Sequence, residues 1–309
     1  MNSIIFPGQG SQYVGMCKEW YEKFEEAKKV FMEADSILKE PLSEIIFDGP
    51  EKDLTKTNNA QPAILVSSIA LLEVIKSKKE IDLNVFCKYF AGHSLGEYTA
   101  LYASGVLNFE SVLKLVKHRG NLMSKSDKSG EGKMSAIIGL KIEQIKKLLE
   151  NFNHKGICEI ANDNSEGQVV ISGHKDAIDS FKEVAKQSGA KLTVDLKVSA
   201  PFHCALMEDA AIKMESEINK TSFNASKVPI ISNVKALPCE NPLEFKSLLS
   251  KQITMSVKWR ETILFMESMG IKKIFEIGPS NVLIGLVKRI TKNIECFSIQ
   301  NPEDMDKIK

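Results

Sequence analysis

The segment GHSLG, residues 92–96, constrains the fold of this 309-residue chain more than any other feature. It follows a short apolar run at residues 89–91 and precedes a series of helix-forming residues at 97–103. The pattern G-x-S-x-G between a strand and a helix is typical of a strained turn that projects its serine, and the helix start offers unpaired N–H groups to a developing oxyanion. We therefore predict that Ser94 is a nucleophile and that the Leu95 N–H is the first oxyanion donor. A plain glycine turn is the alternative interpretation.

Helical and strand-like patterns alternate along the whole chain, which predicts an α/β fold with a largely parallel sheet. Between residues 134 and 198 the order becomes strand, helix, strand, strand, helix, strand, which is typical of a ferredoxin-like unit. The predicted segments are residues 134–138, 141–150, 157–161, 169–172, 176–187 and 191–198. A polar, glycine-containing stretch at 125–133 precedes them as a linker. We expect a large α/β domain formed by residues 1–124 and 198–309, with a ferredoxin-like subdomain, 125–197, inserted in it.

The charges of the chain are balanced, with 41 Lys and Arg against 40 Asp and Glu. This balance argues against nucleic acid or an anionic membrane as the main partner. The N-terminus lacks the basic flank and long apolar core of an export signal. The longest mostly apolar stretch, residues 62–75, is too short for a bilayer of about 30 Å and is expected to form a buried helix. The six cysteines are scattered without a C-x-x-C pair, so we expect reduced thiols and a cytoplasmic protein.

A serine nucleophile needs a base, and the chain has five histidines. His203 lies where an extended run ends at a proline, in the kind of loop that carries functional residues, although an ordinary loop histidine fits the sequence equally well. His93 adjoins the serine but is expected to point away from it. His154 and His174 are expected at the surface, and His118 lies off the apolar face of its predicted helix.

Arg119 lies in the middle of the apolar face of a helix predicted over residues 110–124. A buried guanidinium must find an anion or a set of acceptors, because burying it unpaired is prohibitively costly. A structural salt bridge to a buried Asp or Glu and a carboxylate-binding site are both open from position alone. If the substrate carries a carboxylate, we expect Arg119 to bind it in bidentate fashion.

A second glycine loop, FPGQGSQ at residues 6–12, follows a short apolar run near the N-terminus. It does not complete the dinucleotide-binding pattern G-x-G-x-x-G, because Tyr13 stands where the third glycine belongs. It also lacks the Gly-Lys pair of a phosphate-binding loop. The loop is therefore predicted to have a role other than holding a phosphate.

Several blocks of the chain together resemble a known enzyme family. They are FPGQGSQ (6–12), AGHSLGEY (91–98), HRG around Arg119, NSEGQVVISG (164–173), APFH (200–203) and EIGP (276–279). In order and spacing they resemble the malonyl-CoA:acyl carrier protein transacylases of bacterial fatty acid synthesis, and the acyltransferase domains of polyketide and animal fatty acid synthases. The resemblance runs from Ile4 to about Ile299. It implies an α/β-hydrolase-like core with an inserted ferredoxin-like subdomain.

The resemblance also implies roles for individual residues. Ser94 would carry the acyl group, His203 would be its base, and Arg119 would bind the free carboxylate of malonate. The other implied roles belong to Gln9 and the Leu95 N–H (oxyanion hole), Gln252 (orienting the histidine through its backbone carbonyl), and Asn164, Met123 and Phe202 (pocket lining). Loss of the Gln9 side chain is expected to slow transfer about a hundredfold, as loss of an oxyanion donor does.

Two residues beside His203 bear on specificity and reactivity. Phe202 stands where malonyl-selective members often carry phenylalanine, and its bulk would crowd a 2-methyl group. Such a contact discriminates by about 1–3 kcal/mol. Cys204, where serine or threonine is frequent in the family, is expected to face away from the Ser94–His203 pair.

The implied reaction is the transfer of malonyl from malonyl-CoA to the phosphopantetheine thiol of acyl carrier protein, through a malonyl-serine, in support of fatty acid synthesis. No metal or other cofactor is expected, since the coenzyme A thioester is itself a substrate, and the protein is expected to be a monomer. Docking of an acidic carrier protein would need basic residues near the pocket mouth, with Lys272, Lys273, Lys288, Arg289 and Lys292 as candidates. The alternatives are a serine thioesterase or esterase, a trans-acting acyltransferase of a polyketide synthase, and a non-catalytic carrier-docking subunit.

Overall fold

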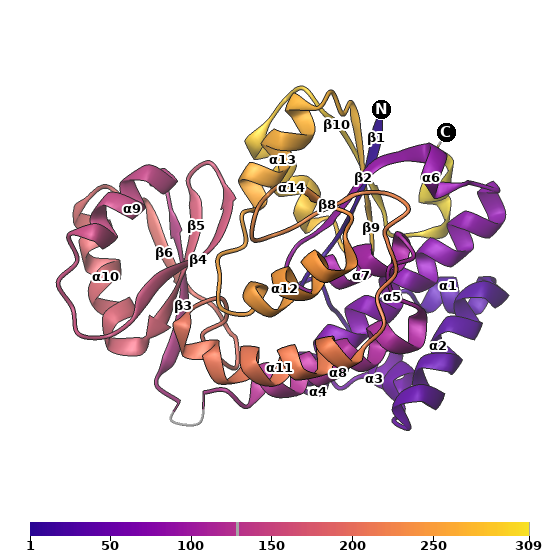
Figure 1. The fold of residues 1–309 in the computed structure, drawn as a ribbon, viewed down its shortest axis with the longest axis horizontal. Coiled ribbons are helices and arrows are strands. Elements are labelled where there is room, and N and C mark those ends of the chain that lie inside the picture. The colour runs from indigo at the N-terminus through magenta and orange to yellow at the C-terminus, as the bar shows by residue number, and fades with distance from the viewer. Residues whose placement is uncertain (128–129, 309) are drawn as a thin grey trace.

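A six-stranded sheet forms the centre of the large part of the chain in the computed structural model, which describes residues 1–127 and 130–308 (Figure 1). Its spatial order is β10-β9-β1-β2-β7-β8, and every neighbouring pair is parallel except β7 with β8. The strands are β1 Asn2–Phe6, β2 Cys87–Gly92, β7 Ile230–Ile231, β8 Pro238–Cys239, β9 Lys273–Ile277 and β10 Glu295–Ile299. The predicted α/β fold with a largely parallel sheet is confirmed.

Both faces of this sheet are buried, which explains why its strands read as continuous apolar runs. Ile4 and Phe6 belong to one core cluster, whereas Ile5 between them belongs to the cluster on the other face. Neighbouring β2 repeats the alternation, with Phe90 on the first face and Tyr89 on the second.

The helices of this part are α1 Lys18–Lys23, α2 Glu25–Leu38, α3 Leu42–Asp48, α4 Glu51–Leu54, α5 Thr57–Lys79, α6 Leu83–Phe86, α7 Gly96–Ala103, α8 Phe109–Ser124, α11 Glu208–Lys220, α12 Pro242–Gln252, α13 Trp259–Ser268 and α14 Val282–Ile290, with short 3₁₀ turns η1 Ala205–Met207 and η2 Pro302–Lys307.

Helix α5 confirms the buried helix predicted over residues 62–75 and is longer than predicted. Among the described helices it is the one long and apolar enough to cross a membrane by length and composition. However, 83% of its most apolar 18-residue window is buried within the protein. Its apolar character is therefore accounted for by core packing.

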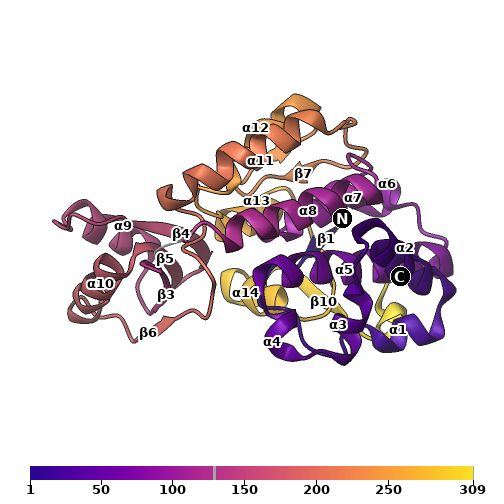
Figure 2. The same ribbon diagram turned by 90° about the horizontal axis from the view of Figure 1, so that it is seen from below.

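The second sheet has four antiparallel strands in the order β4-β5-β3-β6 and lies at one end of the molecule in both ribbon views (Figures 1 and 2). Its elements in chain order are β3 Gly132–Ile138, α9 Ile142–Glu150, β4 Cys158–Ser165, β5 Gln168–His174, α10 Lys175–Gln187 and β6 Leu192–Asp195. This confirms the predicted order of a ferredoxin-like unit, although the last strand is shorter than residues 191–198. The predicted linker at 125–133 includes residues 128 and 129, which lie outside the described residues, and β3 already begins within it. The domain boundaries after residues 124 and 197 remain a prediction.

The small sheet is joined to the large part through β4. Asn162 pairs with Val257, which precedes α13, and the Val257 N–H donates to the Ala161 carbonyl oxygen over 2.9 Å. Beside it the Arg260 Nε lies 3.1 and 3.0 Å from the two carboxylate oxygens of Asp163. These contacts fix the position of β4 relative to the large sheet.

Candidate active site

Ser94 lies in the tight turn between β2 and α7, at the carboxyl end of the parallel strands. The residue with a strained backbone conformation in this turn is the serine itself, whose φ is +50°. The flanking glycines are required for close approach instead. A Cβ on Gly92 would lie 1.9 Å from the Gly96 carbonyl carbon, and a Cβ on Gly96 would lie 2.1 Å from the Phe6 carbonyl oxygen. The main chain of the turn is thus packed directly against itself and against β1.

Asn233, which the sequence analysis did not single out, holds this turn from behind. Its Oδ1 accepts a hydrogen bond from the Ser94 N–H over 2.7 Å, and its Nδ2 donates to the Gly92 carbonyl oxygen over 2.7 Å. Asn233 is fully buried. Nothing in a single sequence marks an asparagine 139 positions away as the partner of the serine.

His203 is the base that the structure brings to Ser94. Its Nε2 lies 2.8 Å from the Ser94 Oγ, and its Nδ1 lies 2.7 Å from the main-chain carbonyl oxygen of Gln252. A carbonyl only accepts, so Nδ1 carries the proton and Nε2 is free to accept the serine proton. Burial, and next the positive charge of Arg119, lower the pKa of His203 to about 3. The imidazole is therefore neutral near neutral pH.

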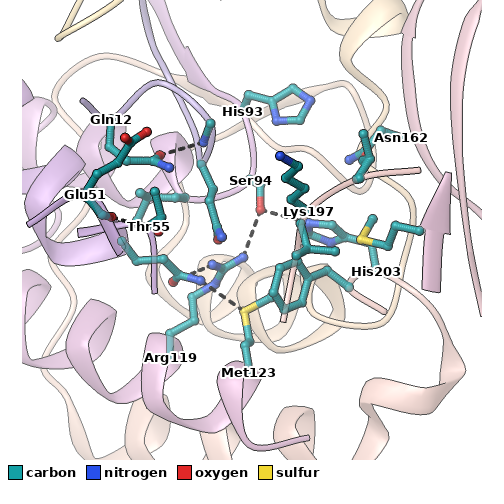
Figure 3. Close-up of a pocket in the computed structure, with 18 of the residues that line it drawn as sticks. Gln12, Glu51, Thr55, His93, Ser94, Arg119, Met123, Asn162, Lys197 and His203 are labelled. Atoms are coloured by element: carbon teal, nitrogen blue, oxygen red, sulfur yellow. Dashed lines mark hydrogen bonds between the residues drawn. The ribbon is translucent and has the colours of Figure 1, made fainter. Parts of the chain in front are cut away.

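Arg119 of α8 is 1% exposed and lies on the other side of the serine (Figure 3). It donates to three neutral oxygens: from one terminal nitrogen to Gln61 Oε1 over 2.7 Å, and from the other to Ser94 Oγ and Gln252 Oε1, each over 3.0 Å. Its Nε has no hydrogen-bond partner among the described residues, and none of their ion pairs involves Arg119. A structural salt bridge, one of the two alternatives that the sequence left open, is therefore not what the structure contains.

Gln9 and Leu95 both line the cavity next to Ser94. The Leu95 N–H, at the start of α7, has no acceptor among the described residues, and neither does the Gln9 main-chain N–H. The Gln9 side chain is engaged elsewhere, since its Nε2 donates to the Thr57 Oγ1 over 3.1 Å. If Gln9 supplies an oxyanion donor in this arrangement, its main-chain N–H is the available group.

The cavity around Ser94 has a volume of about 690 Å³. Met123 and Phe202 line it, as expected. Gln252 does not reach it and is fully buried behind Arg119 and His203. The lining residues that the sequence analysis did not single out include Lys52, Gln61, Met134, Asn162, Lys197 and Val198.

One expectation about the pocket is wrong. Asn162 lines the main cavity, whereas Asn164 lines a smaller neighbouring hollow of about 150 Å³. His93 lines the same cavity as Ser94, and its Nε2 lies 2.8 Å from Asn164 Oδ1 while its ring stands edge-on to Trp259. Burial lowers the pKa of His93. Asn164 therefore reaches the site through His93.

The remaining histidines and Cys204 lie outside the main cavity. His154 and His174 are half-buried rather than exposed, and each accepts a hydrogen bond from a main-chain N–H of the small subdomain. His118 is half-buried on α8. The Cys204 thiol donates to the Pro201 carbonyl oxygen over 3.1 Å and so faces away from the Ser94–His203 pair, as expected.

None of the five basic residues predicted near the pocket mouth lines the main cavity. Lys272 and Lys273 stand at the amino end of β9, whereas Ser94 follows the carboxyl end of the parallel strand β2. These two lysines and Ser94 therefore lie at opposite ends of the parallel strands. Arg289 of α14 contacts Gln168 at the start of β5, on the side of the small sheet. In contrast, Lys52 and Lys197 line the cavity itself.

Comparison with known proteins gives consistent matches over nearly the whole chain. Residues 4–301 match the model of the acyl transferase domain family. A malonyl CoA-acyl carrier protein transacylase of Bacillus subtilis strain 168 is 39% identical over 98% of this chain and 95% of its own length. The crystal structure of an acyl-carrier-protein-S-malonyltransferase from Bartonella henselae superimposes with a TM-score of 0.96 at 43% identity, covering 99% of this chain and 97% of that one. A malonyl-transacylase solved in complex with a type II polyketide synthase acyl carrier protein has a TM-score of 0.95 at 35% identity, covering 99% and 98%.

Proposed function

The chain belongs to the acyl transferase domain family, and we propose that it transfers malonyl from malonyl-CoA to the phosphopantetheine thiol of acyl carrier protein. One observation carries the proposal. A buried guanidinium, Arg119, is held by neutral acceptors and lies within hydrogen-bond distance of the Ser94 Oγ in one cavity. A nucleophile beside a cation that no carboxylate contacts directly suits an acyl group that ends in a carboxylate.

In the first half-reaction the Ser94 Oγ attacks the malonyl thioester carbonyl while His203 Nε2 takes the hydroxyl proton. The carbonyl oxygen becomes an oxyanion that the main-chain N–H groups of Leu95 and Gln9 would stabilise. The C–S bond then breaks, the imidazolium returns its proton to the departing sulfur, and coenzyme A leaves as a thiol. Ser94 is left carrying a malonyl ester.

In the second half-reaction the phosphopantetheine thiol of the carrier takes the place of coenzyme A. His203 removes the thiol proton, the sulfur attacks the ester, and Ser94 leaves with the proton. The acceptor needs no new catalytic group, because the two half-reactions are the reverse of one another. Lys52 and Lys197, which line the cavity, would meet the phosphate-bearing arm of either donor or acceptor.

A serine hydrolase is the main rival, since it would use the same turn and the same histidine. The geometry favours transfer. His203 is oriented by the neutral carbonyl of Gln252 rather than by an Asp or Glu, and hydrolysis has no need of a guanidinium beside the nucleophile.

The remaining aspects of the function are extensions of this proposal. We propose malonyl-CoA as the donor, with no metal and no further cofactor, and a cytoplasmic monomer that binds neither nucleic acid nor membrane. Phe202 and Met123 would limit branching at the malonyl carbon, because both line the cavity. A carrier of polyketide synthesis is the alternative acceptor to that of fatty acid synthesis, because one similar transacylase was solved with such a carrier.

Intact-mass spectrometry after brief exposure to malonyl-CoA tests the proposal. The protein should gain the mass of one malonyl group and pass it to added holo-acyl carrier protein. Ser94→Ala should gain nothing, whereas the matched control Ser268→Ala, on the exposed end of α13, should behave as the natural protein. Free malonate as the main product would indicate a hydrolase. Carrier binding without any adduct would indicate a docking subunit.

A further inference from the structure

We infer that Glu97 is the counter-charge of Arg119, coupled to it through the carboxamide of Gln252, and that Glu97 takes up a proton when an anion arrives at Arg119. The inference rests on the proposed role of Arg119 as the carboxylate-binding residue. Glu97 lies in the first turn of α7, three positions after Ser94, and is 1% exposed. The reaction described above does not use it.

The hydrogen bonds around Gln252 link the two charged groups. Gln252 Nε2 donates to the Glu97 Oε2 over 2.6 Å, and Gln252 Oε1 accepts from Arg119 over 3.0 Å. The same Nε2 lies 3.0 Å from the Ser94 carbonyl oxygen. All neighbours of Nε2 are acceptors and the neighbour of Oε1 is a donor, so a flipped amide would place donor against donor. Glu97 thus fixes the orientation in which Gln252 holds Arg119.

The carboxamide of Gln252 separates Glu97 from Arg119. This separation explains how the charge of a buried guanidinium can be compensated while its N–H donors stay open to substrate. A carboxylate in direct contact with Arg119 would occupy the donors that a malonyl carboxylate needs. Placed behind Gln252, Glu97 lowers the cost of burying the charge without competing for those donors. Arg119 and Glu97 each stabilise the charged form of the other.

The surroundings of Glu97 leave it as the group that can change charge near neutral pH. Burial raises its pKa to about 7, against the lowering effect of the Gln252 and Asn233 hydrogen bonds and of Arg119. The other ionisable groups that face it are Arg119 from α8, Tyr98 from α7 and Cys239 from β8. Burial raises the pKa of both Tyr98 and Cys239 to about 12, so both stay neutral.

Arrival of a malonyl carboxylate changes this balance. The site then holds two negative groups for one guanidinium, and the anion at Arg119 cancels the field that kept Glu97 ionised. Glu97 therefore binds a proton from solvent, and the net charge of the buried site is the same before and after binding. Malonyl binding is expected to weaken as the pH rises through the range in which Glu97 must be protonated.

Calorimetry of malonyl-CoA binding to the non-acylating Ser94→Ala variant tests the proton. Titrations at about pH 8, where a Glu97 with a pKa of about 7 is mostly ionised in the free protein, should show an uptake of up to about one proton in buffers of different ionisation enthalpy. Near pH 7 the largest uptake is about half a proton, because Glu97 is already half protonated there. Acetyl-CoA, which has the same phosphates but no carboxylate, should give a smaller uptake. Adding Glu97→Gln should abolish the difference in proton uptake between malonyl-CoA and acetyl-CoA.

The matched control is Glu276→Gln in the same Ser94→Ala background, because Glu276 is equally buried but is bonded to the main-chain N–H groups of Leu283 and Ile284. It should leave the uptake unchanged. A difference in proton uptake between the two ligands that persists in Glu97→Gln, or no such difference before that substitution, would overturn the inference. Failure of malonyl-CoA to bind at all would instead contradict the proposed function.

A thermal double-mutant cycle tests the pairing without any substrate. The change in Tm caused by Glu97→Gln should be less favourable by several degrees in the natural background than in the Arg119→Gln background, because only the natural background retains the cation that Glu97 compensates. Glu276→Gln should have the same effect in both backgrounds. Equal losses for Glu97→Gln in both backgrounds would refute the pairing. If Glu97→Gln alone does not fold, recovery in the double variant supports the pairing, and failure of the double variant to fold counts against it.

Discussion

Arg119 donates a hydrogen bond to the Ser94 Oγ over 3.0 Å, so the cation and the nucleophile of the site are in direct contact. In a malonyl group the carboxylate is separated from the thioester carbonyl by a single methylene. A guanidinium adjacent to the nucleophile can therefore hold the carboxylate while the carbonyl stands at the Oγ. Longer dicarboxylic acyl groups would separate the two ends too widely for this arrangement.

Arg119→Gln should lower kcat/KM for malonyl transfer about a hundredfold, as loss of one partner of a buried charge pair does. Acetyl transfer should change far less, so the ratio of acetyl to malonyl transfer should rise. Steady-state assays with both coenzyme A esters measure this. Lys114→Ala on the exposed face of α8 is the control, and unchanged malonyl transfer in Arg119→Gln would show that the carboxylate binds elsewhere.

The pH dependence of Ser94 reactivity should shift in the same variant. Burial and the Arg119 charge lower the pKa of His203, so the neutral base persists well into the acidic range. Removing the charge should raise that pKa and move the acid limb of the reaction to higher pH. The rate of Ser94 modification by a sulfonyl fluoride, followed against pH, measures the limb. A limb that stays in place, as it should in Glu276→Gln, would mean that Arg119 has no influence on the base.

Glu276 should make the stability of the fold depend on pH. Burial raises its pKa to about 8 from the ordinary value of 4.5. Because the folded-state pKa is the higher one, the contribution of this group to stability is fully present below about pH 4.5 and is lost as the pH rises through about 8. Glu276→Gln should reduce the fall in Tm between pH 5 and pH 8, to which the raised pKa values of Glu97 and Asp163 also contribute. Identical slopes in the variant and the natural protein would contradict the assignment.

Gln9→Ala should slow malonyl transfer by less than about tenfold, because the side chain is bonded to Thr57 and the main-chain N–H is retained. This revises the hundredfold loss expected from the oxyanion role that the family resemblance implies for Gln9. The measurement is kcat/KM for malonyl-CoA, with Thr57→Val as the companion variant that removes the same hydrogen bond from the other side. A loss of a hundredfold or more in Gln9→Ala alone would identify the side-chain amide as the oxyanion donor.

The sequence was most informative where one residue type at one spacing has a single chemical use. Ser94 lies within such a pattern, and its context of strand and helix is local. His203 and Arg119 needed the resemblance, because position alone left each with an ordinary structural alternative. The sequence does not indicate the roles of Asn233 and Glu97. Asn233 contacts the turn at Ser94 and Glu97 contacts Gln252, and both contacts span well over a hundred residues of the chain.

The errors have identifiable physical causes. Strand β4 has register irregularities between Ile160 and Asn162 and between Asp163 and Ser165. These break the alternation of faces, so the sequence could not indicate that Asn162 rather than Asn164 lines the cavity. The prediction for Lys272 and Lys273 failed because they stand at the amino end of β9, whereas parallel strands present their carboxyl ends to the site.

The two glycines around Ser94 have a consequence for how such an enzyme can be diversified. Gly92 and Gly96 leave no room for a Cβ, so the turn that presents the hydroxyl packs main chain against main chain, and the side chains of Asn233 and Gln252 fix it through hydrogen bonds to its main-chain groups. Met123, Asn162 and Phe202 line the cavity without taking part in that turn. A combinatorial library confined to these three positions would therefore vary the acyl group that is accepted while leaving the geometry of attack untouched.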